Sequence, residues 1–132
     1  MAADQSGGGD AAAVVDRLIG AVEAHDYEGI EAVLAEDIVY DNVPIGVVNG
    51  RSEVSAVLRR TLDRADAVEW RVIRQVAVDD TVMNERLDRF EVGDRWIEIA
   101  VAGIFVVREG EVVLWRDYFD LETYRRQQSF AG

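Results

Sequence analysis

The sequence predicts an α+β domain, in which a curved antiparallel or mixed β-sheet carries N-terminal helices packed into its concave face. The first observation is that apolar residues recur at helical spacing in the N-terminal half. The second is that long extended segments separated by tight turns follow one another from Val68 onward. A chain of 132 residues fits one such domain, expected over residues 10–132 after a flexible, glycine-rich tail at residues 1–9. The resulting cone would enclose a pocket.

Four helical segments are expected from the spacing of their apolar residues. Asp10 is the expected N-cap of the first helix, and His25 follows its last turn, where a capping role is expected. Asp120 is expected to cap the last helix. The expected helices cover residues 11–24, 28–34, 52–62 and 121–127. The first two would form a helical hairpin at the start of the domain.

Five strands are expected, and turn residues separate them. Pro44 and Gly46 end the first strand, and hairpin turns at residues 79–80, 93–94 and 109–110 join the other four. The expected strands cover residues 36–42, 68–78, 81–92, 95–107 and 112–119. A run of hairpin-linked strands after the helices is typical of an α+β domain.

The composition excludes several classes of function. The net charge of −12 argues against nucleic acid, which is bound through basic patches, and no apolar run is long enough to span a membrane. The chain has no cysteine or lysine, so thiolate and Schiff-base chemistry are excluded, and its single histidine cannot build a multi-histidine zinc site. Catalysis would therefore fall to Asp, Glu, Tyr, Asn and Arg. The N-terminus lacks the features of a signal peptide, so a cytoplasmic location is expected.

Asp117 is the residue around which the candidate site is predicted. Successive side chains of a strand alternate between faces, so Trp115, Asp117 and Phe119 share one side. A carboxylate between two large aromatic residues is costly to bury unless other groups hydrogen-bond or neutralise it. Asp117 therefore requires polar partners from elsewhere in the chain.

Two other strands offer polar pairs at i, i+2 spacing. One pair is Tyr40 with Asn42, and the other is Arg86 with Asp88. If these faces line the concave side together with Asp117, two carboxylates converge with a guanidinium, a phenol and an amide. Two nearby carboxylates repel, so one tends to keep a proton, and an arginine can donate to both. The result would be an acid beside a base, able to protonate an oxygen leaving group and to activate water.

Structural alternatives exist for each of these residues. Arg86 and Asp88 could form a solvated pair, with Met83 and Leu87 facing inward instead. Asp117 could be a buried residue that serves only its neighbouring arginine or a backbone turn. Tyr40 could be a core aromatic residue and Asn42 a turn former. A magnesium ion between the two carboxylates is disfavoured by the arginine beside them.

Six sequence segments together resemble the limonene-1,2-epoxide hydrolase family. They are YDNVP (40–44), GR (50–51), ERLD (85–88), GIFV (103–106), EG (109–110) and WRDYFD (115–120). The resemblance covers nearly the whole chain after the tail, and the motifs occur in the order typical of the family. It implies a cone-shaped fold of the nuclear-transport-factor-2 (cystatin-like) type, a homodimer, and opening of epoxides in one step without a cofactor or covalent intermediate.

The resemblance also implies a role for each polar residue. Asp117 would be the general base that activates water, and Tyr40 and Asn42 would hold that water. Asp88 would be the general acid that protonates the epoxide oxygen, and Arg86 would bridge the two carboxylates. The apolar walls of the substrate pocket would come from Ile19, Val22, Phe90, Ile99, Val101 and Phe119.

The implied reaction partners are water and a small hydrophobic epoxide, of a terpenoid, lipid or steroid-like kind. Two rival functions fit the same cone. A ketosteroid-isomerase-like enzyme would use the aspartates and Tyr40 for enolisation, although Arg86 beside Asp88 suits water activation better. The other rival is a non-catalytic module that binds hydrophobic ligands.

Overall fold

The computed structural model describes residues 3–131, and the side chains of residues 10–128. The helices are α1 (Ala3–Glu23), α2 (Tyr27–Ala32), α3 (Arg51–Leu62) and α4 (Leu121–Ala131). The strands are β1 (Leu34–Asn42), β2 (Gly46–Asn49), β3 (Ala67–Val78), β4 (Thr81–Val92), β5 (Arg95–Arg108) and β6 (Glu111–Tyr118). No helix in this described part is long and apolar enough to cross a membrane.

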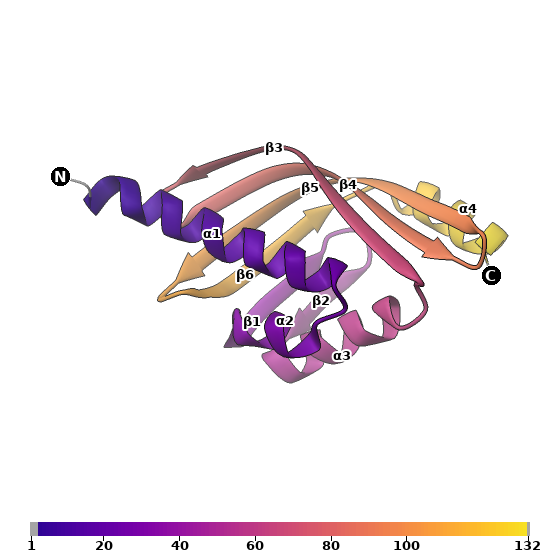
Figure 1. The fold of residues 1–132 in the computed structure, drawn as a ribbon, viewed down its shortest axis with the longest axis horizontal. Helices are drawn as coiled ribbons and strands as arrows, with labels where there is room; N and C mark the ends of the chain where they lie inside the picture. The colour runs from indigo at the N-terminus through magenta and orange to yellow at the C-terminus, as the bar shows by residue number, and fades with distance from the viewer. Residues whose placement is uncertain (1–2, 132) are drawn as a thin grey trace.

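The six strands form one curved sheet in the order β2-β1-β6-β5-β4-β3 (Figure 1). β1 and β6 pair in parallel and every other pair is antiparallel, so the sheet is mixed. The long helix α1 lies across the sheet alongside β3, whereas α2 and α3 pack near β1, and α4 lies at the far end. The predicted α+β fold is confirmed.

The core lies between α1 and the concave face of the sheet. The apolar stripe of α1 is buried, with Val14, Leu18 and Val22 each no more than 2% exposed. Removing such side chains from water supplies most of the free energy that holds a helix on a sheet. On the sheet, Trp115 of β6 is fully buried and stacks on Phe105 of β5, with ring centroids 5.7 Å apart. The site described below is built directly beside this aromatic layer.

Several predicted boundaries were wrong by one residue or more, including those of the first two helices. α1 begins at Ala3, so Asp10 lies inside the helix, because the glycines before it lower helix propensity without blocking the helix sterically. α2 begins one residue earlier than predicted, at Tyr27, after the Asp26 carboxylate accepts a hydrogen bond from the Gly29 amide. Leu34 belongs to β1, where it pairs with Val112, rather than to α2. The flexibility of residues 1–9 stays a prediction.

β2 is a strand that the sequence analysis missed. It has only four residues and pairs with β1 alone, so it offers too few alternating positions to be recognised. Pro44 and Gly46 do end β1, as predicted, but the chain then turns back as an edge strand. This hairpin supplies one wall of the cavity described next.

Candidate active site

A row of residues on the concave face crosses the sheet. Strand register places Asn42 of β1 beside Asp117 of β6, then Gly103 of β5, Asn84 of β4 and Gln75 of β3. Directly opposite residues of neighbouring strands share a face, and both Asp117 and Asn84 are buried. Four polar side chains thus line up on one side of the sheet, with a glycine between them.

Arg86 connects the two predicted carboxylates. Its guanidinium is fully buried and makes two hydrogen bonds to Asp88, from Nε to Oδ1 and from Nη2 to Oδ2, each 3.0 Å long. The same Nη2 atom donates to Oδ2 of Asp117 at 3.0 Å. The alternative of a solvated Arg86–Asp88 pair is wrong, because Met83 is 49% exposed on the opposite face. One nitrogen therefore holds two buried carboxylates together.

Burial and the neighbouring charges shift the pKa values of Asp88, Asp117 and Arg86 in opposite directions. Burial raises the pKa of Asp88 to about 6, although Arg86 acts in the opposite direction. Burial also raises the pKa of Asp117, again opposed by Arg86. Burial disfavours the charge on Arg86, but the two carboxylates outweigh this effect and raise its pKa, so it stays charged. Both acids therefore hold a proton to higher pH than a solvent-exposed aspartate does.

Tyr40 and Asn42 lie on β1 beside Asp117. Tyr40 is 6% exposed, and its ring centroid is 4.3 Å from that of Trp115, its partner in the parallel register. Burial and the nearby Asp117 raise the pKa of Tyr40, so its hydroxyl keeps its proton and can donate a hydrogen bond. The oxygen Oδ1 of Asp117 has no hydrogen-bond partner among the described residues, and it is buried over Gly103 of β5.

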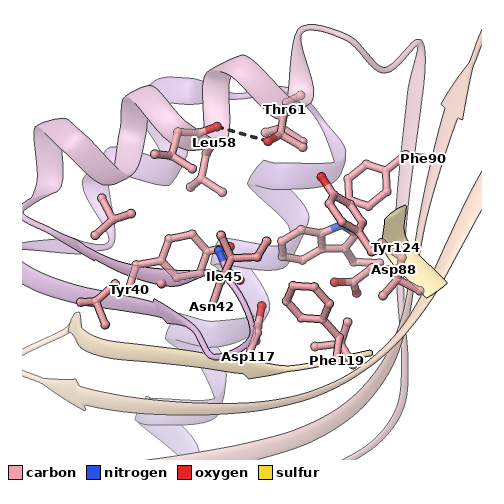
Figure 2. Close-up of a pocket in the computed structure, with 18 residues that line it drawn as sticks. Tyr40, Asn42, Ile45, Leu58, Thr61, Asp88, Phe90, Asp117, Phe119 and Tyr124 are labelled. Carbon is pink, nitrogen blue, oxygen red and sulfur yellow. Dashed lines mark hydrogen bonds between the residues drawn. The ribbon is translucent and has the colours of Figure 1, made fainter. Parts of the chain in front are cut away.

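A cavity of about 460 Å³ opens over these groups (Figure 2). Asp88 and Asp117 both line it, together with Tyr40 and Asn42, whereas Arg86 does not. Arg86 lies behind the carboxylates, so it acts through them rather than by contact with a ligand. The remaining lining residues, mostly apolar, are Ile45, Gly46, Val47, Val48, Val57, Leu58, Thr61, Leu62, Trp70, Phe90, Ile99, Val101, Phe119 and Tyr124. A volume of this size suits a small organic molecule.

Comparison with protein families places this chain in a known group. Residues 9–129 match the family model described as the limonene-1,2-epoxide hydrolase catalytic domain. The chain belongs to the limonene-1,2-epoxide hydrolase family. This result confirms the resemblance found in the sequence motifs, and membership makes the chain an enzyme of the epoxide hydrolase class.

One epoxide hydrolase sequence and one epoxide hydrolase structure are similar to this chain, and another protein shares its fold. Epoxide hydrolase EphG of Mycobacterium tuberculosis is 33% identical over 107 residues, which are 81% of this chain and 71% of that protein. The solved structure of an M. tuberculosis LEH-like epoxide hydrolase has a TM-score of 0.82 at 30% identity and covers 92% of this chain and 91% of its own. A protein with a ketosteroid isomerase-like fold from Catenulispora acidiphila has a TM-score of 0.77 at 19% identity, covering 88% and 92% of the two chains. The last comparison shows a shared fold alone.

The structure brings only some of the predicted wall residues to the cavity. Phe90, Ile99, Val101 and Phe119 line it, but Ile19 and Val22 do not, as they belong to the core between α1 and the sheet. Helical periodicity predicts which face of α1 is buried. It does not predict whether that face meets a cavity or packed side chains, so this part of the prediction requires correction.

Several cavity residues were missed by the sequence analysis. α3 and β2 supply a large share of the wall, and Trp70 of β3 and Tyr124 of α4 complete it. Trp70 of β3 lies directly opposite Asp88 of β4 in the sheet. The guanidinium carbon of Arg86 lies 5.0 Å from the centroid of the Trp70 ring. Its position between the charged Glu69 and Arg71 was a signal that the indole faces inward.

His25, predicted as a capping residue, lies where α1 meets the end of α3. Its backbone is left-handed, with φ of 54°, and its Nε2 atom lies 3.0 Å from the carbonyl oxygen of Leu62 and 3.1 Å from that of Ala65. Leu62 is the last residue of α3 and Ala65 follows it, so the imidazole binds carbonyl groups at the end of a helix other than its own. His25 does not line the cavity.

The raised pKa of Asp88 predicts an unusual dependence of stability on pH. Because the folded protein holds this proton up to about pH 6 and the unfolded chain only to about 3.8, the folded state binds more protons between these values. We expect the free energy of unfolding of the wild type, relative to Asp88→Asn, to fall as the pH rises from 3.8 to 6 and to level off above. Urea denaturation of both proteins at several pH values measures this difference. A difference that grows with pH in this window would contradict the prediction.

Proposed function

We propose that the cavity binds a hydrophobic epoxide, of a terpenoid, lipid or steroid-like kind, and that water opens it to a vicinal diol in one step. The observation that carries this proposal is the buried pair of carboxylates held by one nitrogen of Arg86 at the cavity wall. An acid and a base of related chemistry, held side by side, are what concerted protonation and water activation require.

Asp117 fits the role of the general base. Its Oδ2 atom is bonded to Arg86, whereas Oδ1 has no partner among the described residues and belongs to a side chain that lines the cavity. A water molecule that donates to the Asp117 carboxylate from the cavity could be held also by Tyr40 and Asn42 of the neighbouring strand β1. Proton transfer from this water to Asp117 would let its oxygen attack an epoxide carbon.

Asp88 fits the role of the general acid. Its raised pKa favours the protonated form that the role needs. Each of its oxygens accepts one hydrogen bond from Arg86 in this structure and keeps a second lone pair that can carry the proton. The proton would then pass to the epoxide oxygen as the carbon–oxygen bond breaks. The cycle closes when Asp117 releases its proton to solvent and Asp88 takes one up.

The walls of the cavity support a hydrophobic substrate. Phe90, Ile99 and Val101 belong to the sheet, and Leu58 and Leu62 belong to α3. In Figure 2, Leu58 and Phe119 lie on opposite sides of the cavity. Burial of apolar substrate surface against these side chains would supply binding free energy, and it would exclude bulk water from the reacting atoms. The charged residues that line the cavity are Asp88 and Asp117, which would fix the position of the epoxide oxygen.

Single-turnover reactions in water enriched with heavy oxygen test the one-step mechanism. With enzyme in excess over a panel of terpenoid, fatty-acid and steroid epoxides, we expect the label in the first diol formed and none in the protein. An intermediate ester on an aspartate would instead place the label in the protein, and its detection would reject the mechanism.

The same panel separates the rival functions. Diol formation supports the proposed hydrolysis. A ketosteroid isomerised without hydration would support an isomerase instead, and an epoxide retained unchanged would support a binding module.

Homodimerisation stays a prediction, and the outer face of the sheet supports it. Val76 of β3 pairs with Met83 of β4, and both are exposed, at 63% and 49%. Tyr118 of β6 is 45% exposed, at a position whose neighbours along the strand, Asp117 and Phe119, line the cavity on the other face. Exposed apolar side chains gathered on a sheet favour association with another protein surface. The cytoplasmic location likewise stays a prediction.

A further inference from the structure

Asn84 binds the buried guanidinium of Arg86 through Nη1, whereas the carboxylates bind it through Nε and Nη2. Its Oδ1 atom accepts a hydrogen bond from Nη1 of Arg86 at 2.9 Å, and the side chain is 5% exposed. It does not line the cavity, so it cannot contact a substrate there. Asn84 is therefore a buried polar residue for which the proposed reaction gives no direct use.

A chain of hydrogen bonds fixes the orientation of the Asn84 amide. Its Nδ2 atom donates to Oε1 of Gln75 at 3.0 Å, and Nε2 of Gln75 donates to Oδ1 of Asp16 at 3.1 Å. An ionised carboxylate can only accept and a guanidinium can only donate, so the two ends of the chain set the direction of both amides. Flipping either amide would place two donors or two acceptors against each other.

We propose that Asn84 is a positioning residue that holds the Arg86 guanidinium against Asp88 and Asp117, with Gln75 and Asp16 fixing its amide. The inference rests on the proposed function, since it assigns Asn84 a part in the geometry of the same acid–base pair. It adds a residue from β4 and a link to α1 that extends the site beyond the cavity wall.

The geometry explains why an amide is suited to this position. Nε and Nη2 of Arg86 face the carboxylates, so Nη1 would be left without this partner if Asn84 were apolar, and burying an unpaired charged donor is costly. A third carboxylate in its place would compete with Asp88 and Asp117 for the single guanidinium. It would also add negative charge to the cluster. A neutral acceptor satisfies Nη1 without either effect.

Asn84→Leu tests the proposal by kinetics. Loss of the Nη1 contact should let the guanidinium move from the carboxylates, and we expect kcat to fall about 10- to 100-fold with KM changed little. Because Arg86 lowers the pKa of both acids, a less well held Arg86 should move the acid limb of the pH profile to higher pH. Glu85→Gln is the matched control, since Glu85 lies on the same strand and its carboxylate bonds to the exposed Arg74.

Carbon NMR of isotope-labelled aspartate side chains gives a readout that does not depend on turnover. In folded Asn84→Leu, checked by circular dichroism, we expect Asp88 and Asp117 to titrate at higher pH than in the wild type. If Asn84→Leu fails to fold, Gln75→Leu replaces it. This variant keeps Asn84 but removes the oxygen that accepts a hydrogen bond from Nδ2 of Asn84. It should shift the aspartate titration in the same direction, but by less.

The outcomes separate this inference from the proposed function. Unchanged aspartate titration in the folded variant overturns the positioning role, whatever the activity. Failure of the wild type to hydrolyse any epoxide rejects the proposed function, while a shifted titration would still support Asn84 as the residue that holds Arg86.

Discussion

Asp117→Asn is expected to lower kcat about 10²- to 10⁴-fold at neutral pH, the range typical of a lost general base. An amide has nearly the shape of a carboxylate, and its oxygen can still accept the hydrogen bond from Nη2 of Arg86. It cannot take a proton from water, so the attacking hydroxyl would no longer be generated within the cavity. Asp117 is only 4% exposed, between Trp115 and Phe119, and asparagine fills the same space. The fold should therefore persist, which circular dichroism and thermal unfolding would verify.

Asp120→Asn supplies the matched control for this substitution. Asp120 is an exposed carboxylate three residues further on, which accepts from the amide and hydroxyl of Thr123 at the start of α4 and does not line the cavity. Asparagine caps helices as well as aspartate does, so we expect its rate to match the wild type. Full activity in Asp117→Asn, with loss in Asp88→Asn alone, would contradict the assignment of the base.

The sequence could predict the inward-facing side of β6 because alternation there is unambiguous. Trp115 and Phe119 lie two residues on either side of Asp117, so all three share one face of the strand. Shifting the strand register by one residue would expose both aromatic side chains. Tyr40 and Asn42 follow the same logic on β1, with Ile38 continuing the buried face. The structure brings these polar groups to one cavity, as predicted, although their catalytic roles stay proposals.

Alternation could not decide the orientation of β4. A face carrying Asn84, Arg86 and Asp88 looks more polar than the face carrying Met83 and Leu87, so hydrophobicity alone would turn the charges outward. Burial of Arg86 is favourable only because carboxylates from its own strand and from β6 pair with it. That pairing depends on strand register across β5, a long-range property that no local pattern contains.

A local sequence pattern also could not predict which helix lines the cavity. The buried stripes of α1 and α3 have the same helical spacing, yet Leu58 and Leu62 line the cavity and Ile19 and Val22 are packed in the core. The difference comes from where each helix lies over the sheet. α1 packs against β3, whereas α3 lies beside β1 and β2, and residues of these three elements line the cavity.

Gly103→Ala is expected to disrupt the site more severely than the addition of one methyl group suggests. Gly103 lies on β5 between Asn84 and Asp117, and Arg86 reaches across it to Asp117. A Cβ atom there would lie 2.4 Å from Nη1 of Arg86 and 2.9 Å from the Oδ1 atoms of both Asn84 and Asp117. The guanidinium is fully buried and already bonded on three nitrogens, so it cannot move without losing hydrogen bonds.

We therefore expect Gly103→Ala to lower the free energy of unfolding by about 1–3 kcal/mol, as other overpacked cores do, and kcat by about 10²-fold or more. Gly20→Ala is the matched control, since a methyl group at this exposed position of α1 would meet nothing within 4 Å. Alanine favours helix over glycine, so that variant should keep full activity and gain up to about 1 kcal/mol. Urea denaturation and steady-state kinetics on the three proteins make the comparison. Wild-type activity in folded Gly103→Ala would show that the carboxylate pair does not depend on the position of Arg86, and would remove the structural basis for joining these residues in one mechanism.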